Sequence, residues 1–347
     1  MTLPLATTVP AVKALILGGG TFVGRRVLDR LHAAGHQVTV LNRGLTATSL
    51  PDGVEQLVAD RKDWATMHAV LNGTTWDAVI DVSGFVQVAG QSDMEKLVEL
   101  LDGNVGRYVF VSSIMAYQPS GFFPWREHAA VRPDPPTTYG GFKVMVERLI
   151  LDRHATTGFP STIVRPAAIY GPNNNIFDME AAMFLRLLQG RPVLVPHDGL
   201  VVNSYGHVDD LALAIDVQCT HPGAVGEIFN ITAEAITTGE YVQVLAEIVG
   251  KPANVVMVAD ELRERLEKPA WGHLFNAVHH SVISFEKARD VLGVSPKIEF
   301  HDGHRATLEW FLASGMADVD SPMVDPLWRP SWDFEWEAEV AALAGGT

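Results

Sequence analysis

The sequence predicts an α/β fold in which a doubly wound parallel sheet carries helices on both faces. Two observations lead to this prediction. Short apolar runs alternate with helical patterns through the first half of the chain, and this order of elements requires crossover connections and therefore a parallel sheet. The runs are also apolar at nearly every position, as expected for strands that are covered on both faces.

The first strand and helix, within residues 12–24, are the most informative elements. The apolar run 12–17 ends in glycines, and a helical pattern begins at once behind Thr21. Glycines at such a turn let the backbone approach a pyrophosphate, and the N–H groups and dipole of the helix stabilise its charge. The stretch therefore predicts a nucleotide-binding turn made by Gly18, Gly19, Gly20, Thr21, Phe22, Val23 and Gly24.

The remaining elements follow in the same alternation. The expected strands are Gln37–Leu41, Val54–Val58, Ala78–Asp81, Tyr108–Val111 and Thr162–Val164. The expected helices are Val23–Ala34, Trp64–Leu71, Gln91–Leu101 and Phe142–His154. The loop 171–175 breaks this rhythm. It precedes helical patterns at Met179–Gln189, Asp209–Val217 and Thr238–Val249, and a late strand at Ile228–Ile231.

This pattern predicts two domains. Residues 11–172 and about 205–232 form a dinucleotide-binding domain, and residues of about 173–204 and 233–347 form a smaller substrate-binding domain. The tail after Ser321 is rich in Trp, Pro and Asp. It either packs over the domain junction or forms a subunit contact. In the second case the protein would be a homodimer.

Composition narrows the class of protein. The 347 residues carry a net charge of −15, which disfavours nucleic acid and anionic membranes as partners. The single cysteine, Cys219, excludes an internal disulfide and a cysteine-based zinc site, and the late His pairs give no metal site. No apolar run reaches the length of a membrane span, and the first twelve residues lack the basic start of a signal peptide. We expect a cytoplasmic protein that binds a small-molecule substrate.

Tyr139 and Lys143 are the candidate catalytic pair. Their spacing of four residues places them on one face of a helix. A nearby ammonium lowers the pKa of a phenol, so the pair can exchange a proton with a substrate hydroxyl while a nicotinamide carries hydride. Ser113 closes an expected strand 26 residues earlier, and its hydroxyl can donate to the same substrate oxygen. Taken alone, Ser112 and Ser113 would be read as strand-end caps.

At these residues the chain resembles the extended short-chain dehydrogenase/reductases, a group that includes nucleotide-sugar epimerases. Matching motifs follow in order from Val12 to Gly303, including Arg165–Pro172, Tyr205–Leu211, Phe229–Ile231 and Phe285–Gly293. The resemblance implies a Rossmann-type sheet with a smaller C-terminal substrate-binding domain. It also implies that Ser113, Tyr139 and Lys143 are the catalytic triad and that Asp60 contacts the adenine. Further cofactor contacts are expected from Arg61, Ser83, Gly84, Lys143 and Pro166.

Three departures from the family pattern concern ligands. Thr21 replaces the middle glycine of the turn, as in atypical members that include the chloroplast stem-loop RNA-binding proteins. Asn42 and Arg43 stand where NAD-preferring members carry an acidic residue; Arg43 either pairs with a 2′-phosphate or is a solvated loop residue. The cofactor is therefore NADP or NAD, with NADP favoured. Asn203 occupies the position of an arginine that grips the substrate diphosphate, which disfavours a nucleoside-diphosphate sugar.

Two further comparisons with the family limit the substrate. A second family arginine has no counterpart in 270–280, and Ile114 and Met115 replace the acidic pair of sugar dehydratases. Trp125, in the loop before Tyr139, is a candidate substrate contact. We expect an NAD(P)-dependent oxidoreductase acting at a secondary alcohol or ketone carbon of a polar, sugar-like substrate. The alternatives are an epimerase using the same site, and a non-catalytic cofactor sensor or RNA-binding protein.

Overall fold

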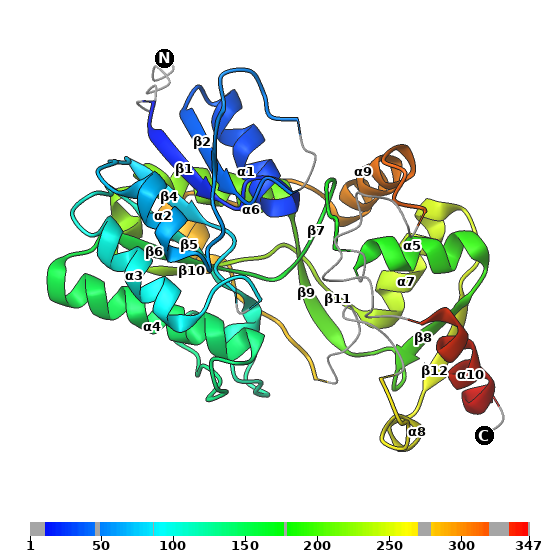
Figure 1. Cartoon of the computed structure of the whole chain (residues 1–347). Helices are drawn as coiled ribbons and strands as arrows, with labels where there is room; N and C mark the ends of the chain where they lie inside the picture. The colour runs from blue at the N-terminus through cyan, green and yellow to red at the C-terminus, as the bar shows by residue number, and fades with distance from the viewer. Residues whose placement is uncertain are drawn as a thin grey trace, which may run out of the picture.

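A computed structural model gives the fold and describes residues 11–45, 49–85, 87–176, 179–269, 279–318 and 333–345. These residues form two lobes (Figure 1). The larger lobe holds a seven-stranded sheet, and the smaller lobe is built from helices and short strands of the second half of the chain. Strands β7 (Ala168–Tyr170) and β9 (Val202–His207) pair in parallel and lie between the two lobes in Figure 1.

The large sheet is parallel between every pair of neighbours, in the order β10-β6-β5-β4-β1-β2-β3. Its strands are β1 (Lys13–Leu17), β2 (Gln37–Asn42), β3 (Glu55–Val58), β4 (Ala78–Asp81), β5 (Tyr108–Val111), β6 (Ser161–Pro166) and β10 (Ile228–Ile231). The order of strands reverses at β1, which has β2 on one side and β4 on the other. In such sheets ligands bind at the carboxyl ends of the strands beside this reversal.

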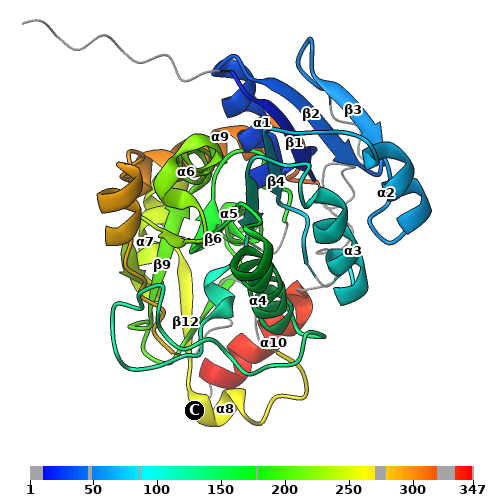
Figure 2. The same cartoon turned by 90° about the vertical axis from the view of Figure 1, so that its left-hand side faces the viewer.

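Helices cover both faces of this sheet, because alternate residues of each strand point to opposite sides. Ala14 and Ile16 of β1 share a core with α1 (Phe22–Ala33) and α6 (Val208–Thr220). Leu15 and Leu17 pack on the other face with three helices, which lie together in front of the sheet in Figure 2. These helices are α2 (Trp64–Leu71), α3 (Gln91–Leu101) and α4 (Tyr139–Thr157).

The smaller lobe has its own apolar core, which includes Phe184, Tyr241 and Phe311. Its helices are α5 (Glu180–Gln189), α7 (Thr238–Val249), α8 (Asp260–Arg263), α9 (Phe300–Ala313) and α10 (Phe334–Gly345). Its strands are β8 (Pro192–Pro196) paired in parallel with β12 (Asn254–Val258), and β11 (Ala235–Thr237), which pairs antiparallel with β9. Short helical turns complete the chain: η1 (Ile114–Ala116), η2 (Pro222–Ala224) and η4 (Ala288–Leu292).

The predicted fold class is confirmed, and the elements of the first half lie within a few residues of their expected bounds. Strands β7, β8, β9, β11 and β12 were not predicted. They are short, and β8 begins and ends with proline while β9 contains polar residues and glycine, so neither shows the usual apolar pattern of a strand. Residues 321–332 of the Trp-rich tail lie outside the described residues. Among the described residues, no helix is long and apolar enough to cross a membrane.

Candidate active site

Tyr139 and Lys143 lie one turn apart at the start of α4. The hydroxyl of Thr138 caps this helix by accepting a hydrogen bond from a backbone amide of its first turn at 3.1 Å, which sets where the helix begins. Lys143 is only 2% exposed, and its Nζ donates to the carbonyl oxygens of Gly84 at 2.8 Å and Val111 at 2.7 Å. The same Nζ lies 5.5 Å from the centre of the Tyr139 ring.

Ser113 reaches the same place from the carboxyl end of β5. It is the N-cap of η1, where its Oγ accepts a hydrogen bond from Met115 N at 3.1 Å. Its hydroxyl lies close enough to the phenol of Tyr139 to lower the pKa of that phenol. The structure therefore brings Ser113, Tyr139 and Lys143 together at the carboxyl edge of the sheet, where ligands of such folds bind.

Burial determines the protonation of this group. It raises the pKa of Tyr139 above its usual value, and the nearby hydroxyl of Ser113 partly opposes that rise. Burial also lowers the pKa of Lys143 to about 7, against the attraction of Asp81 and Glu147. The sequence predicts that Lys143 lowers the pKa of Tyr139, whereas here the loss of hydration dominates for both groups. The phenol is therefore protonated at neutral pH and can serve as an acid.

The glycine turn is closely packed against neighbouring backbone. Gly18 adopts φ +97°, and a Cβ on it would stand 2.8 Å from the Cβ of Ser83. A Cβ on Gly24 would stand 2.0 Å from the carbonyl oxygen of Gly18, so the helix begins directly against the turn. Only glycine fits these two positions. Such a turn leading into a helix N-terminus fits the pyrophosphate of a dinucleotide.

Phe22, the first residue of α1, has an unusual backbone conformation for a residue with a side chain. Its φ is +38°, and its N–H donates to the carbonyl oxygen of Asn173 at 3.1 Å. Asn173 is itself left-handed, with φ +69°. The loop that interrupts the strand–helix alternation therefore reaches back to the nucleotide-binding turn, which the sequence does not predict.

The residues expected around the adenosine lie at the ends of β2 and β3. Asn42 Oδ1 accepts from Gly44 N and from Gln56 Nε2, both at 2.8 Å, so this side chain shapes its own loop. Arg43 is exposed, and within the described residues its side chain makes no hydrogen bond or ion pair. Asp60 is exposed, and one carboxylate oxygen caps the backbone N–H of Lys62 at 2.9 Å.

Arg61 takes a different position from that of its exposed neighbours. It is 5% exposed and forms a two-pronged ion pair with Asp81, with Nη2 2.8 Å from Oδ2. Its Nη1 also donates to Ser83 Oγ at 3.0 Å. Arg61 therefore holds the segment next to the glycine turn through Ser83. Tyr108 binds the same carboxylate as Arg61, since its hydroxyl donates to Asp81 at 2.7 Å. Pro166 ends β6 and is buried in the same sheet.

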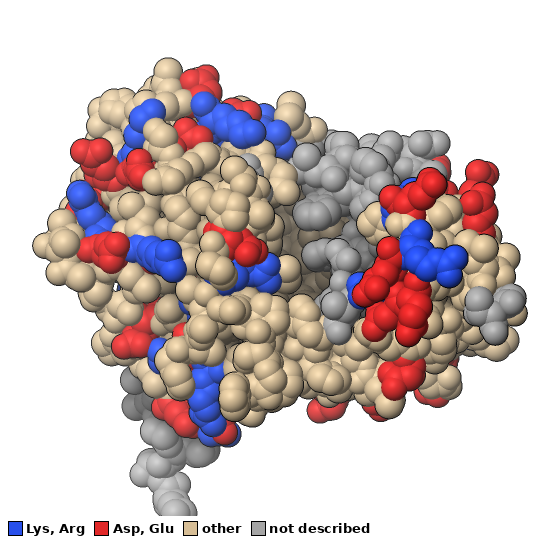
Figure 3. All heavy atoms as spheres, turned by 90° about the horizontal axis from the view of Figure 1, so that it is seen from below, with Lys and Arg blue, Asp and Glu red and all other residues tan. Residues whose placement is uncertain are grey.

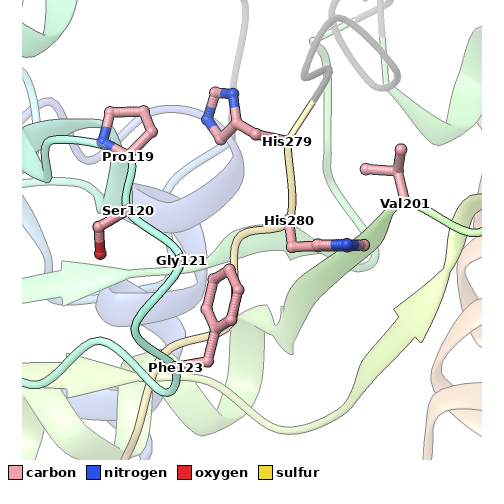
Figure 4. Close-up of a pocket in the computed structure, with 7 residues that line it drawn as sticks. All are labelled: Pro119, Ser120, Gly121, Phe123, Val201, His279 and His280. Carbon is pink, nitrogen blue, oxygen red and sulfur yellow. The ribbon is translucent and has the colours of Figure 1, made fainter.

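The structure contains a cavity of about 340 Å³, which Ser113, Tyr139 and Lys143 do not line (Figure 4). The loop that follows η1 forms one wall, and Val201 before β9 forms another. The described lining residues are Pro119, Ser120, Gly121, Phe123, Val201, His279 and His280. Figure 4 shows Phe123 and the two imidazoles between these walls. The lining is mainly apolar, and it contains no lysine or arginine among the described residues.

Neither Asn203 nor Trp125 is among the described residues that line this cavity. Asn203 Oδ1 accepts from Ser281 Oγ at 2.8 Å, while its buried Nδ2 has no partner in the described part of the chain. Trp125 is 3% exposed and stacks behind Phe123, with ring centres 5.9 Å apart. Its expected contact with substrate stays a prediction. The region of the second expected arginine, residues 270–278, lies outside the described residues.

Comparison with known proteins agrees with this arrangement. The family model described as "NAD dependent epimerase/dehydratase family" matches residues 14–232. The chain belongs to this family. It is therefore an enzyme of the extended short-chain dehydrogenase/reductase kind, as the resemblance implies. Among the described residues, no group of three or more His, Cys, Asp or Glu side chains is arranged to hold a metal ion.

The names of individual relatives describe different activities. The chain is 32% identical over 306 residues to the chloroplast stem-loop binding protein of 41 kDa b from Arabidopsis thaliana, covering 84% of this chain and 77% of that protein. It is 29% identical over 208 residues to a dTDP-glucose 4,6-dehydratase from Streptomyces antibioticus, covering 60% and 58%. The epimerase Mth375 from Methanothermobacter thermautotrophicus shares the fold, with TM-score 0.74 at 21% identity over 88% of this chain and 93% of that one.

Sequence reasoning did not identify several residues of the site. Phe123, His279 and His280 come from segments far apart in the chain, and only the folded protein brings them to one cavity. Asp81 was expected as the last residue of an apolar strand and nothing more. Its charge at the carboxyl end of that strand was the available signal, because an acidic residue is seldom fully buried without a partner.

Proposed function

We propose that this protein is an oxidoreductase that uses NADP(H), or else NAD(H), and acts at a secondary alcohol or ketone carbon of a polar, sugar-like substrate. The observation that carries the proposal is the assembly of Ser113, Tyr139 and Lys143 at the carboxyl edge of the large sheet. The Ser113 hydroxyl close to the phenol and the buried lysine beside it supply the groups that proton transfer requires.

In the direction of ketone reduction, the substrate oxygen lies against the hydroxyls of Ser113 and Tyr139. Ser113 holds this oxygen by a hydrogen bond, and Tyr139, which is protonated at neutral pH, donates its proton to it. Lys143, when charged, stabilises the phenolate that remains. A nicotinamide held by the glycine turn and Lys143 would supply or accept the hydride at the carbon. In the direction of alcohol oxidation, Tyr139 must first lose its proton, so this direction is favoured at higher pH.

The choice of NADP rests on Arg43. This guanidinium is exposed at the end of β2, beside the turn, and has no ion-pair partner in the described part of the chain. No carboxylate follows β2 to accept a ribose hydroxyl. A phosphate on that ribose would give Arg43 a bidentate partner, whereas NAD would leave it in solvent.

The proposed substrate has no nucleoside diphosphate. The side chain at the family's arginine position, Asn203, is hydrogen-bonded to Ser281, and the described walls of the cavity offer two imidazoles and no stronger cation. Phe123 gives the cavity an aromatic wall that suits the apolar face of a sugar ring. A diphosphate would lose its charge-assisted hydrogen bonds in this cavity.

Hydride tracing tests the reaction. The full chain would be mixed with NADPH carrying deuterium at the transferable position and with a panel of nucleotide-free ketoses and keto-sugar acids. We expect loss of the cofactor absorbance at 340 nm and one deuterium in each product molecule. Tyr139→Phe serves as the control. Loss of absorbance that persists in this variant would contradict the assignment of Tyr139.

Two results would favour a sugar-nucleotide epimerase that uses the same residues. One is micromolar affinity of the unmodified protein for UDP, measured by calorimetry. The other is a stoichiometric nicotinamide that stays with the protein through purification and does not exchange, because an epimerase restores its cofactor in every cycle. We expect weak UDP binding, improved in Asn203→Arg, and a protein that purifies mostly without dinucleotide and binds NADPH reversibly.

RNA binding is the second candidate function, because the chloroplast stem-loop binding protein is the relative with 32% identity. The charge of the chain argues against it. Figure 3 shows acidic side chains gathering over the smaller lobe, and no continuous basic stripe crosses this face. Binding of a labelled stem-loop RNA at physiological salt, with an affinity that falls steeply as salt rises, would support RNA binding. We expect no such binding.

A further inference from the structure

We propose that Asp81, at the carboxyl end of β4, is a positioning residue for the catalytic lysine: it holds the Ser83–Gly84 turn against Lys143 and sets a fixed negative charge beside it. This inference rests on the proposed function only in taking Lys143 as the lysine of the catalytic site. It assigns a role to a buried ion pair that lies outside the Ser–Tyr–Lys group.

The first observation is the close packing of Gly84 on Asp81. A Cβ on Gly84 would stand 3.2 Å from each carboxylate oxygen of Asp81 and 2.7 Å from the ring of Phe110. The backbone of Gly84 therefore rests directly on the carboxylate. From this position its carbonyl oxygen accepts the hydrogen bond from Lys143 Nζ at 2.8 Å. A shift of the carboxylate would move this acceptor.

The second observation is that Asp81 itself cannot move easily. It is fully buried, and its two oxygens accept hydrogen bonds from both terminal nitrogens of Arg61. Tyr108 donates to the same carboxylate at 2.7 Å. Arg61 Nη1 also donates to Ser83 Oγ at 3.0 Å, which ties the turn to the ion pair. A carboxylate held by charged and neutral donors at once is a rigid support.

The third observation concerns the charges that face Lys143. Asp81 belongs to β4 and is paired with Arg61. Glu147 lies one turn after Lys143 along α4. Glu147 is shared with Arg165, whose Nη2 is 2.6 Å from Oε2, and with Ser112. Tyr139 and Tyr108 are the phenols of this region, and burial raises the pKa of both.

Asp81 and Arg61 act on Lys143 in opposite directions. Burial lowers the pKa of Lys143 to about 7; Asp81 and, more weakly, Glu147 oppose this, whereas Arg61 adds to it. Removing the carboxylate should therefore disfavour the ammonium further, and removing the guanidinium should favour it. A pair that merely supported the fold would behave otherwise, since loss of either partner would loosen the same turn and let water reach Lys143.

The test is a pH titration of the cofactor-free full chain by NMR, with lysines labelled with carbon-13 at Cε and the Lys143 signal assigned from its loss in Lys143→Met. Asp81→Asn should lower the measured pKa of Lys143, and Arg61→Gln should raise it, each by about one unit. Glu337→Gln, which breaks the buried pair of α10 with Arg186, is the matched control and should leave the signal in place. Shifts of Asp81→Asn and Arg61→Gln in the same direction, or no shift in either, would overturn the proposal.

A second variant keeps the test decisive if Asp81→Asn does not fold. Gly84→Ala leaves both charges in place but pushes the carbonyl oxygen away from Lys143, so the ammonium loses an acceptor and the pKa of Lys143 should fall. An unchanged titration in a folded Gly84→Ala protein would reject the role of the turn. None of these readouts needs a substrate, so a failure of the proposed reaction would leave the result on Asp81 interpretable.

Discussion

The two halves of the cleft are built in different ways. On the cofactor side, backbone atoms form the site: the turn excludes a Cβ at Gly18 and Gly24, and Lys143 donates to two carbonyl oxygens. On the substrate side, side chains from three separate segments line a cavity, and Asn203 retains a buried Nδ2 without a partner among the described residues. Substitutions on the first side should therefore change cofactor binding or proton transfer, and those on the second should change the substrate.

The largest expected effect is that of Tyr139→Phe, which should lower turnover without a matching loss of cofactor affinity. Loss of the phenolic hydroxyl removes the proton donor, and turnover should fall roughly a hundred- to ten-thousand-fold. The affinity for NADPH should stay within a few-fold, because the turn and Arg43 are unchanged. Steady-state kinetics and fluorescence titration measure the two effects. Tyr205→Phe is the matched control, since the hydroxyl of Tyr205 has no hydrogen bond among the described residues.

The next effect distinguishes the two dinucleotides. Arg43→Ala should weaken NADPH by about 1.5–3 kcal/mol, the contribution of a charge-assisted hydrogen bond, and should leave NADH almost unchanged. Fluorescence titration with both cofactors measures the difference. Arg148→Ala, on the exposed side of α4, removes a cation elsewhere and should change neither affinity. Equal losses for NADPH and NADH would remove Arg43 from the cofactor site.

A pair of glycine substitutions compares the cofactor side with the substrate side directly. Gly24→Ala forces a Cβ to within 2.0 Å of a carbonyl oxygen, and overpacking of this kind costs about 1–3 kcal/mol, so NADPH affinity should drop. Gly121→Ala adds the same methyl group to the cavity wall, where nothing lies within 4 Å. We expect it to leave NADPH affinity unaltered. Similar losses in both variants would show that the two sides are not independent.

The last effect is on the dependence of stability on pH. The pKa of Lys143 is about 7 in the folded chain, against an ordinary value of 10.5. Between these values the unfolded chain binds more protons, so the free energy of unfolding should rise with pH, by up to about 1.4 kcal/mol per unit from this residue. Below pH 7 both states are protonated and the cost of burial is fully present. Lys143→Met should lose this slope in urea unfolding between pH 7.5 and 9.5, whereas the exposed Lys62→Met should keep it.

The cofactor side could largely be predicted because its determinants are local in sequence. The turn at Gly18–Gly24 and the spacing of Tyr139 and Lys143 each lie within a few residues, where backbone periodicity dictates neighbours. The substrate side could not be predicted, because its residues are far apart in the chain. The imidazole of His280 accepts a hydrogen bond from the backbone N–H of Val202, 78 positions earlier, and this contact brings His280 to Val201. The aromatic character of Trp125 suggested a ligand contact, but tertiary packing placed Phe123 in front of it.

The late position of β10 has a consequence for the synthesis of the chain. This strand forms one edge of the large sheet, where Phe229 lies opposite Val164 of β6. The two residues are more than sixty positions apart, and α5, β8 and β9 of the other parts of the molecule are made in between. While the ribosome produces those elements, β6 has an open edge whose backbone groups can pair with another chain. The larger lobe therefore completes its sheet only after α5, β8 and β9 have been made, whereas α7, α9 and α10 of the smaller lobe are made later still.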